Sequence, residues 1–106
     1  TLALRGAEVI FHPAQWTAAR QYHWETLTAA RAIENQLFVV SCNACGERGG
    51  VVYGGFSRIL DPWGEVLAQG GGGEELLCAE LDLARVREIR STINVFRDRR
   101  AELYRL

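Results

Sequence analysis

Residues 29–43 read AARAIENQLFVVSCN, a helical composition that passes into an apolar run almost without a loop. Ala, Arg and Glu favour a helix as far as Gln36, whereas the β-branched and aromatic residues of Leu37–Cys42 favour a strand. Residues 23–36 contain no Gly or Pro, and apolar residues recur there at spacings of three or four: Trp24, Leu27, Ala30, Ile33 and Leu37. This spacing predicts a helix over 23–36 whose apolar face covers a sheet.

A second apolar run, Ala7–His12, precedes this helix and is closed by Pro13. We expect a buried strand here, and the order strand, helix, strand predicts a parallel βαβ arrangement. Glu34 and Asn35, at the end of the helix, are expected to hydrogen-bond the backbone or Arg31.

The loop Pro13–Trp16 follows the first predicted strand. Ligands bind beyond the carboxyl ends of strands in α/β sheets, so this loop is a candidate pocket wall. An ordinary surface loop with one partly buried Trp is an equal alternative.

Residues 43–60 are turn-rich and then apolar. We interpret Asn43–Gly50 as a loop. Val51–Tyr53 and Phe56–Leu60 flank Gly54-Gly55 and form either one strand with a glycine bulge or two short strands.

The turn Asp61-Pro62-Trp63-Gly64 has Asp, Pro and Gly at the positions where a β-turn favours them, and it predicts a hairpin between residues 58–60 and 66–68. Residues 75–81 are expected to form another strand, and Asp82 to cap a short helix over 83–89. The tail, Asn94–Leu106, mixes apolar and basic residues, which suggests an arm docked on another surface.

The composition excludes several classes of partner. Of the 106 residues 48% are hydrophobic, enough for a core, and the formal net charge is -1. This balance offers no basic surface for nucleic acid or an anionic membrane, and no apolar run approaches the roughly 20 residues that span a bilayer. We expect a cytoplasmic protein with neither partner.

The chain begins at Thr1 and contains no Met. Thr1–Gly6 resembles the tail of a helix ended by a left-handed glycine, so we expect a fragment or a processed product.

Three cysteines, an odd number, fit a reducing compartment. Cys42 and Cys45 form a C-x-x-C pair at the end of a strand, whereas a redox pair needs a helix N-terminus that lowers the thiol pKa. With Cys78 distant and the two histidines spaced unlike any metal motif, we expect buried apolar cysteines, no metal and no cofactor. No His or carboxylate close in sequence would activate Cys42 as a nucleophile.

Five motifs occur in a definite order: residues 4–10, LRGAEVI; His12-Pro13-Ala14; His23-Trp24-Glu25 leading to residues 30–36; residues 61–68, DPWGEVLA; and residues 95–100 before Leu103-Tyr104. In this order the chain resembles the carbon–nitrogen hydrolase (nitrilase) superfamily. Within it, the closest resemblance is to ω-amidase-type members, which hydrolyse ω-amides of small dicarboxylic acids.

This resemblance implies an α/β fold that is the C-terminal half of a four-layer α-β-β-α sandwich, with residues 1–106 as the C-terminal portion of a single domain. The family's Glu-Lys-Cys triad lies upstream of the matching region, so no catalytic residue is assigned here and the 106-residue chain alone is predicted to be inactive. The full-length protein is expected to be an amidase. The alternative is a non-catalytic scaffold or interaction fragment.

The resemblance also implies the pocket and the partners. A small-molecule amide would be bound by residues of the loop after the first strand and of a second strand end: Pro13, Ala14, Gln15, Trp16 and Phe56. Arg20 is added as a candidate partner for a substrate carboxylate. Many ω-amidase-like relatives carry His where Phe56 stands. The expected protein partners are the N-terminal half of the same protein and a second copy, in a homodimer reached by the C-terminal arm.

Overall fold

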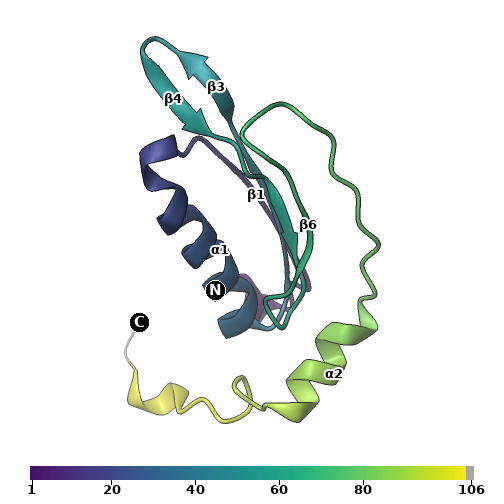
Figure 1. The fold of residues 1–106 in the computed structure, drawn as a ribbon. Coiled ribbons are helices and arrows are strands. Elements are labelled where there is room, and N and C mark those ends of the chain that lie inside the picture. The colour runs from purple at the N-terminus through teal and green to yellow at the C-terminus, as the bar shows by residue number, and fades with distance from the viewer. Residues whose placement is uncertain (105–106) are drawn as a thin grey trace.

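The computed structural model describes residues 1–104 and contains a four-stranded sheet with the strand order β1-β2-β5-β6. Its strands are β1 (Val9–Ala14), β2 (Phe38–Asn43), β5 (Arg58–Leu60) and β6 (Val66–Gln69). β1 and β2 are parallel, and α1 (Gln21–Asn35) joins them and covers one face of the sheet (Figure 1). The predicted βαβ arrangement and the α/β class are therefore confirmed.

The helix ends as predicted, directly before the strand. Gln36 closes α1 in the left-handed conformation at φ 48°, and its backbone N–H donates to the carbonyl oxygens of Ala32 and Ile33. Its side-chain Nε2 donates to the Ile93 carbonyl at 2.8 Å. Glu34 pairs with Arg31, and Asn35 Nδ2 donates to the Arg31 carbonyl at 3.0 Å, as expected.

The buried face of α1 differs from the predicted one. Trp24, Thr28 and Ala32 are buried, whereas Leu27 and Ile33 are 39% and 53% exposed. Thr28 is tolerated against the sheet because its hydroxyl donates to the Trp24 carbonyl at 2.8 Å, which satisfies the polar group within the helix. The core beneath this face joins α1 to both central strands: Ala3, Ala32, Leu37, Val39 and Leu60.

Two predicted boundaries of the strands are wrong. β1 continues through Pro13 to Ala14, because β1 is the edge strand of the described sheet and an edge position tolerates a missing N–H. Residues 43–50 are not a loop: β3 (Cys45–Arg48) and β4 (Val51–Gly54) form a hairpin that extends beyond the sheet. Gly49 and Gly50, at φ 59° and 78°, make its turn.

The expected strand over residues 75–81 is absent from the described chain. The segment between β6 and α2 (Ala84–Thr92) is extended, but it forms no backbone hydrogen-bond ladder with any strand within residues 1–104. β-propensity alone does not produce a strand, because the backbone needs a neighbouring edge.

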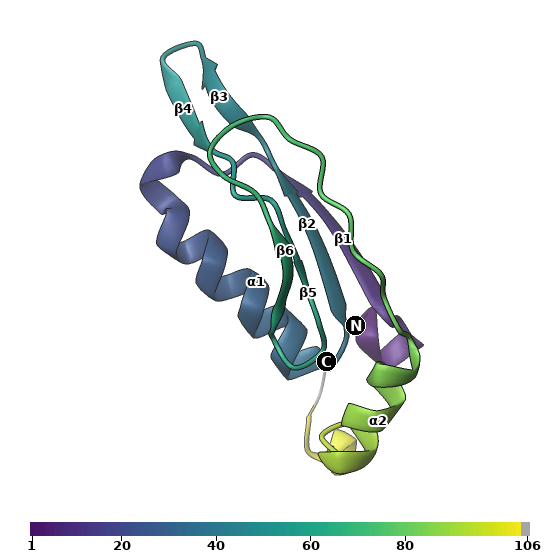
Figure 2. The same cartoon turned by 45° about the vertical axis from the view of Figure 1, so that its right-hand side comes forward.

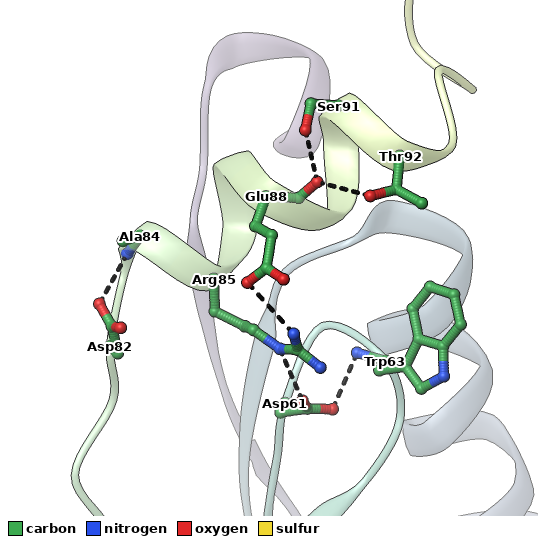
Figure 3. Close-up of polar contacts among 8 residues, drawn as sticks. All are labelled: Asp61, Trp63, Asp82, Ala84, Arg85, Glu88, Ser91 and Thr92. Atoms are coloured by element: carbon green, nitrogen blue, oxygen red, sulfur yellow. Dashed lines mark hydrogen bonds and ion pairs between the residues drawn. The ribbon is translucent and has the colours of Figure 1, made fainter.

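The predicted hairpin of β5 and β6 is confirmed, with Arg58 opposite Gln69. In its turn, Gly64 N–H donates to the Asp61 carbonyl at 3.0 Å. The buried Asp61 carboxylate accepts the Glu65 N–H at 2.9 Å. It also accepts the Trp63 N–H at 2.8 Å and lies 3.7 Å from Arg85 Nε (Figure 3). Because Arg85 belongs to α2, this contact ties the turn to the C-terminal helix.

The helix over 83–89 is confirmed as α2, and Asp82 Oδ1 accepts the Ala84 N–H at 3.0 Å. Gly6 has the predicted left-handed φ, 92°, but follows only a single turn, η1 (Ala3–Arg5). The two other short 3-10 turns are η2 (Ala18–Arg20) and η3 (Ala101–Leu103). Part of the predicted arm, residues 105–106, lies outside the described residues.

The face of the sheet opposite α1 is open along β1 and at the carboxyl end of β2. Phe11 on β1 is 73% exposed, and Pro13 and Cys42 are also exposed. The chain between β6 and α2 passes on this side of the sheet, opposite α1 (Figure 2). None of the helices in residues 1–104 has the length and apolar character that crossing a membrane requires.

Candidate functional site

The carboxyl ends of β1 and β2 lie at the same end of the sheet, and Asn43 links them. Asn43 is the last residue of β2, and Trp16 follows β1 by two residues. The Trp16 N–H donates to Asn43 Oδ1 at 2.6 Å. Asn43 Nδ2 in turn donates to the carbonyl oxygens of Trp16 at 3.2 Å and Gly55 at 2.9 Å. Two segments distant in sequence therefore meet on one side chain.

The second of these segments is the Gly55-Phe56 turn, which follows β4 and leads to β5. Phe56 adopts a left-handed φ of 52°, which is unusual for a residue with a side chain. Its N–H donates to the Gly71 carbonyl at 2.7 Å, and its carbonyl accepts Trp24 Nε1–H at 2.8 Å. Both backbone groups of Phe56 are thus held, one of them by a buried side chain of α1.

Aromatic side chains of α1, β1 and the loop after β1 lie against one another beside this turn. The Trp24 ring stacks on His12 at a centroid distance of 5.4 Å and lies 5.9 Å from the Trp16 ring. The Arg20 guanidinium lies 4.3 Å from the centroid of the Trp16 ring, within the range of a cation–π contact.

Two cavities flank the loop after β1. One, of about 330 Å³, opens on the α1 side and is mainly apolar, with Ile10, Leu27 and Val39 beside Trp16 and Trp24. The other, of about 350 Å³, lies along the β3–β4 hairpin and is mainly polar, with Gln15, Cys45, Glu47, Arg48 and Tyr53. Adjacent loop residues therefore face different cavities.

The structure brings some of the predicted site residues together and separates others. Trp16 and Arg20 are in contact. Phe56 is linked to them by Trp24, which hydrogen-bonds the Phe56 carbonyl and lies beside the Trp16 ring. Gln15 faces the polar cavity. Pro13 is exposed on the open face of the sheet, and Ala14 is half-buried at the end of β1.

The sequence reasoning missed Asn43 and the role of Trp24. Asn43 is 6% exposed and Trp24 1%. The available signal was a polar residue at the end of an apolar strand, since a buried carboxamide requires hydrogen-bond partners.

The expectation of buried cysteines is wrong for two of the three. Cys42 and Cys78 are exposed and Cys45 is half-buried. Cys42 faces the open side of the sheet, and Cys78 lies in the unpaired segment before α2, so neither is covered. Among residues 1–104, no three His, Cys, Asp or Glu side chains are grouped as a metal site would need.

A buried cation lies behind the site. Arg58 on β5 is 7% exposed, and its Nη1 donates to the Glu25 carbonyl at 3.1 Å. Burial lowers the pKa of the Arg58 guanidinium, and the nearby Glu25 charge acts in the opposite direction. The Nη1 contact ties β5 to α1 across the space between the sheet and the helix.

Comparisons with known proteins agree on one family. The carbon-nitrogen hydrolase family model matches residues 1–91. A 2-oxoglutaramate amidase from Bacillus subtilis is 48% identical over 94% of this chain and 39% of its own length. An omega-amidase from Homo sapiens is 36% identical over 96% of this chain and 38% of its own length.

Solved structures share the fold. A carbon-nitrogen hydrolase from Helicobacter pylori has a TM-score of 0.90 and 32% identity, covering 96% of this chain and 41% of that one. The C. elegans NitFhit protein also has a TM-score of 0.90, with 39% identity, covering 98% of this chain and 27% of that one. The chain thus spans about two fifths of the length of the amidases above, and the expected nitrilase-type fold is confirmed.

Proposed function

The chain belongs to the carbon-nitrogen hydrolase family, and from this we propose that it is the C-terminal portion of an amidase domain that hydrolyses the ω-amide of a small dicarboxylic acid. The observation that carries the proposal is the 48% identity to a 2-oxoglutaramate amidase across 94% of the chain. The similarity to an omega-amidase supports the same substrate class.

The proposed reaction divides between two parts of the polypeptide. An upstream portion supplies Glu, Lys and Cys. Glu, as general base, takes the Cys thiol proton as the sulfur attacks the amide carbon, and Lys stabilises the oxyanion of the tetrahedral intermediate. Glu then returns this proton to the departing nitrogen as the C–N bond breaks. Ammonia leaves, and water then hydrolyses the acyl-enzyme to release the dicarboxylic acid. Residues 1–106 contribute the sheet, the pocket wall and the binding of the substrate's far end.

Arg20 is proposed to bind the free carboxylate of the substrate. An ω-amide of a dicarboxylic acid carries one carboxylate that does not react, and a guanidinium can hold it with two parallel hydrogen bonds. Arg20 is exposed and takes part in none of the ion pairs found within residues 1–104. Its contact with the Trp16 ring orients the guanidinium without neutralising it.

The proposed assembly follows from the open surfaces. The sheet face that carries Phe11 is proposed to pack against the N-terminal portion of the same polypeptide, because an exposed apolar sheet face requires a cover. The tail beyond Asn94, where Leu103 and Tyr104 are 65% and 68% exposed, is proposed to reach a second copy in a homodimer.

The proposal is tested by ammonia release. The polypeptide that carries this chain behind an upstream half is incubated with 2-oxoglutaramate, with a neutral amide of similar size and with a nitrile. We expect ammonia from 2-oxoglutaramate, and none when the 106-residue chain is used alone. A longer polypeptide that hydrolyses no amide and no nitrile would contradict the proposal.

A further inference from the structure

We propose that Asn43 is a positioning residue of the site, which holds the loop after β1 and the Gly55-Phe56 turn in one fixed arrangement. The inference rests on the proposed function for its meaning in catalysis. Its physical basis is independent of that function, because it lies in the hydrogen bonds of one buried carboxamide.

The carboxamide of Asn43 is engaged on both sides. Its oxygen accepts the Trp16 N–H, and its nitrogen donates to two main-chain carbonyls, those of Trp16 and Gly55. These partners lie 27 and 12 residues away in sequence. Among side chains of this size, only that of Asn offers one acceptor and two donors in a single plane.

The same residue is also held through its backbone. Asn43 N–H donates to Ser57 Oγ at 3.0 Å, and β2 pairs with β1 up to Ala14 opposite Asn43. The carboxamide therefore projects from a fixed strand end and cannot follow a moving loop. With 6% exposure, it has little access to water that could replace its partners.

The consequence is that Trp16 is held at both of its backbone groups. Its N–H and its carbonyl both bond Asn43, and the carbonyl also accepts the Gly54 N–H at 3.0 Å. The residue before it, Gln15, faces the polar cavity, and the Trp16 ring supports Arg20. Asn43 thus sets the positions of Gln15 and Arg20 without contacting a ligand itself.

A purely structural role predicts a different result from a positioning role. If Asn43 only stabilised the fold, its replacement would reduce the fraction of active protein, and KM would not change. If Asn43 positions the pocket wall, the folded variant binds substrate less well, and KM rises while kcat changes little.

The experiment compares Asn43→Asp and Asn43→Ala in the full-length enzyme with the control Asn35→Ala. Asn43→Asp keeps the acceptor and removes both donors, and Asn43→Ala covers the case in which the carboxylate prevents folding. Asn35→Ala removes a carboxamide that bonds within α1. Ammonia release gives kcat and KM for 2-oxoglutaramate, and hydrogen exchange reports the backbone amides of Trp16 and Gly54.

We expect both Asn43 variants to raise KM about tenfold or more, with kcat within about threefold of the unsubstituted enzyme. The Trp16 and Gly54 amides should exchange faster, while the control changes neither reading. An unchanged KM, or unchanged exchange at Trp16, would overturn the inference. If the unsubstituted enzyme releases no ammonia, the proposed function fails, and the exchange of Trp16 alone decides whether Asn43 positions the loop.

Discussion

At the residue scale, buried polar side chains hold main chain that secondary structure leaves unpaired. Trp24 donates to the Phe56 carbonyl, and Asn43 hydrogen-bonds the main chain of Trp16 and Gly55. Asp61 accepts two N–H groups of its own turn. The main-chain groups that these side chains bind lie between elements, where backbone groups lose their ladder partners. These residues therefore determine how the loops sit on the sheet.

Replacing Arg20 by Gln tests the proposed carboxylate contact. The substitution removes the charge but leaves a shorter polar side chain on an exposed position. We expect KM for 2-oxoglutaramate to rise about tenfold or more, because an ionic hydrogen bond to the carboxylate is lost. KM for a neutral amide of similar size should not change.

The matched control is Arg87→Gln, an exposed arginine on α2 that takes part in no ion pair found within residues 1–104. If both arginine substitutions changed KM equally, or if Arg20→Gln changed KM equally for both substrates, Arg20 would not bind the carboxylate.

Replacing Trp24 by Phe tests the indole hydrogen bond. Phe retains much of the ring packing but leaves the Phe56 carbonyl without its donor. We expect the free energy of unfolding to fall by about 1–3 kcal/mol, measured by urea denaturation. Trp63→Phe is the control, because Trp63 is 48% exposed, and we expect a change of no more than about 0.5 kcal/mol. Similar losses for both variants would argue against a special role of the Trp24 indole.

At the element scale, the β3–β4 hairpin depends on a two-residue turn. Arg48 pairs with Val51, so only Gly49 and Gly50 connect the strands, both with positive φ. Two-residue turns of this kind follow the twist of the flanking strands and need residues that adopt a left-handed backbone. The polar cavity beside Gln15 is built on this hairpin, so the turn also shapes the candidate site.

Gly49→Asn and Gly49→Val separate backbone strain from packing. A Cβ at Gly49 meets nothing within 4 Å, so only the conformation at φ 59° matters. Asn adopts this conformation readily, and we expect it to change stability little. Val should destabilise the hairpin by about 1–3 kcal/mol, seen as faster hydrogen exchange at Gly46 and Tyr53, the next hydrogen-bonded pair of the ladder after Arg48 and Val51. Equal exchange in the two variants would mean that the turn adopts another conformation.

At the scale of the whole molecule, the two faces of the sheet differ. α1 covers one face over the core, while the other carries Phe11 at 73% exposure (Figure 2). An exposed aromatic side chain on a sheet face marks a surface that packs against a partner. The extended chain before α2 passes on the same side and forms no hydrogen-bond ladder with a strand of residues 1–104. Both features fit the proposed N-terminal portion as the missing cover.

Phe11→Glu tests this cover. In a co-expression of residues 1–106 with the proposed N-terminal portion, we expect Phe11→Glu to reduce co-purification at least about tenfold, because a charge is buried without a partner. Tyr22→Glu is the control, since Tyr22 is 76% exposed but lies on α1, at the opposite face. Equal recovery of the two complexes would place the interface elsewhere.

The candidate site shows how far the sequence could predict it. The loop Pro13–Trp16 was predicted from its place after the first strand and from the resemblance to a family, and the turn at Phe56 from the resemblance alone. The structure joins Trp16 to this turn through Asn43. Asn43 itself was not found, because its partners lie far away in sequence and no local pattern records them. The predicted contact of these residues with substrate remains a prediction.

The sequence by itself determined the features that depend on near neighbours in the chain. These are the helix before β2, the βαβ order, the Asp61–Gly64 turn and the α2 cap, because periodicity, turn chemistry and capping act over a few residues. Only the tertiary structure decided which face of α1 is buried, that Pro13 lies within an edge strand, and that residues 75–81 have no ladder. Each of these depends on what lies beside the element, and burial and strand pairing are properties of the neighbours rather than of the segment.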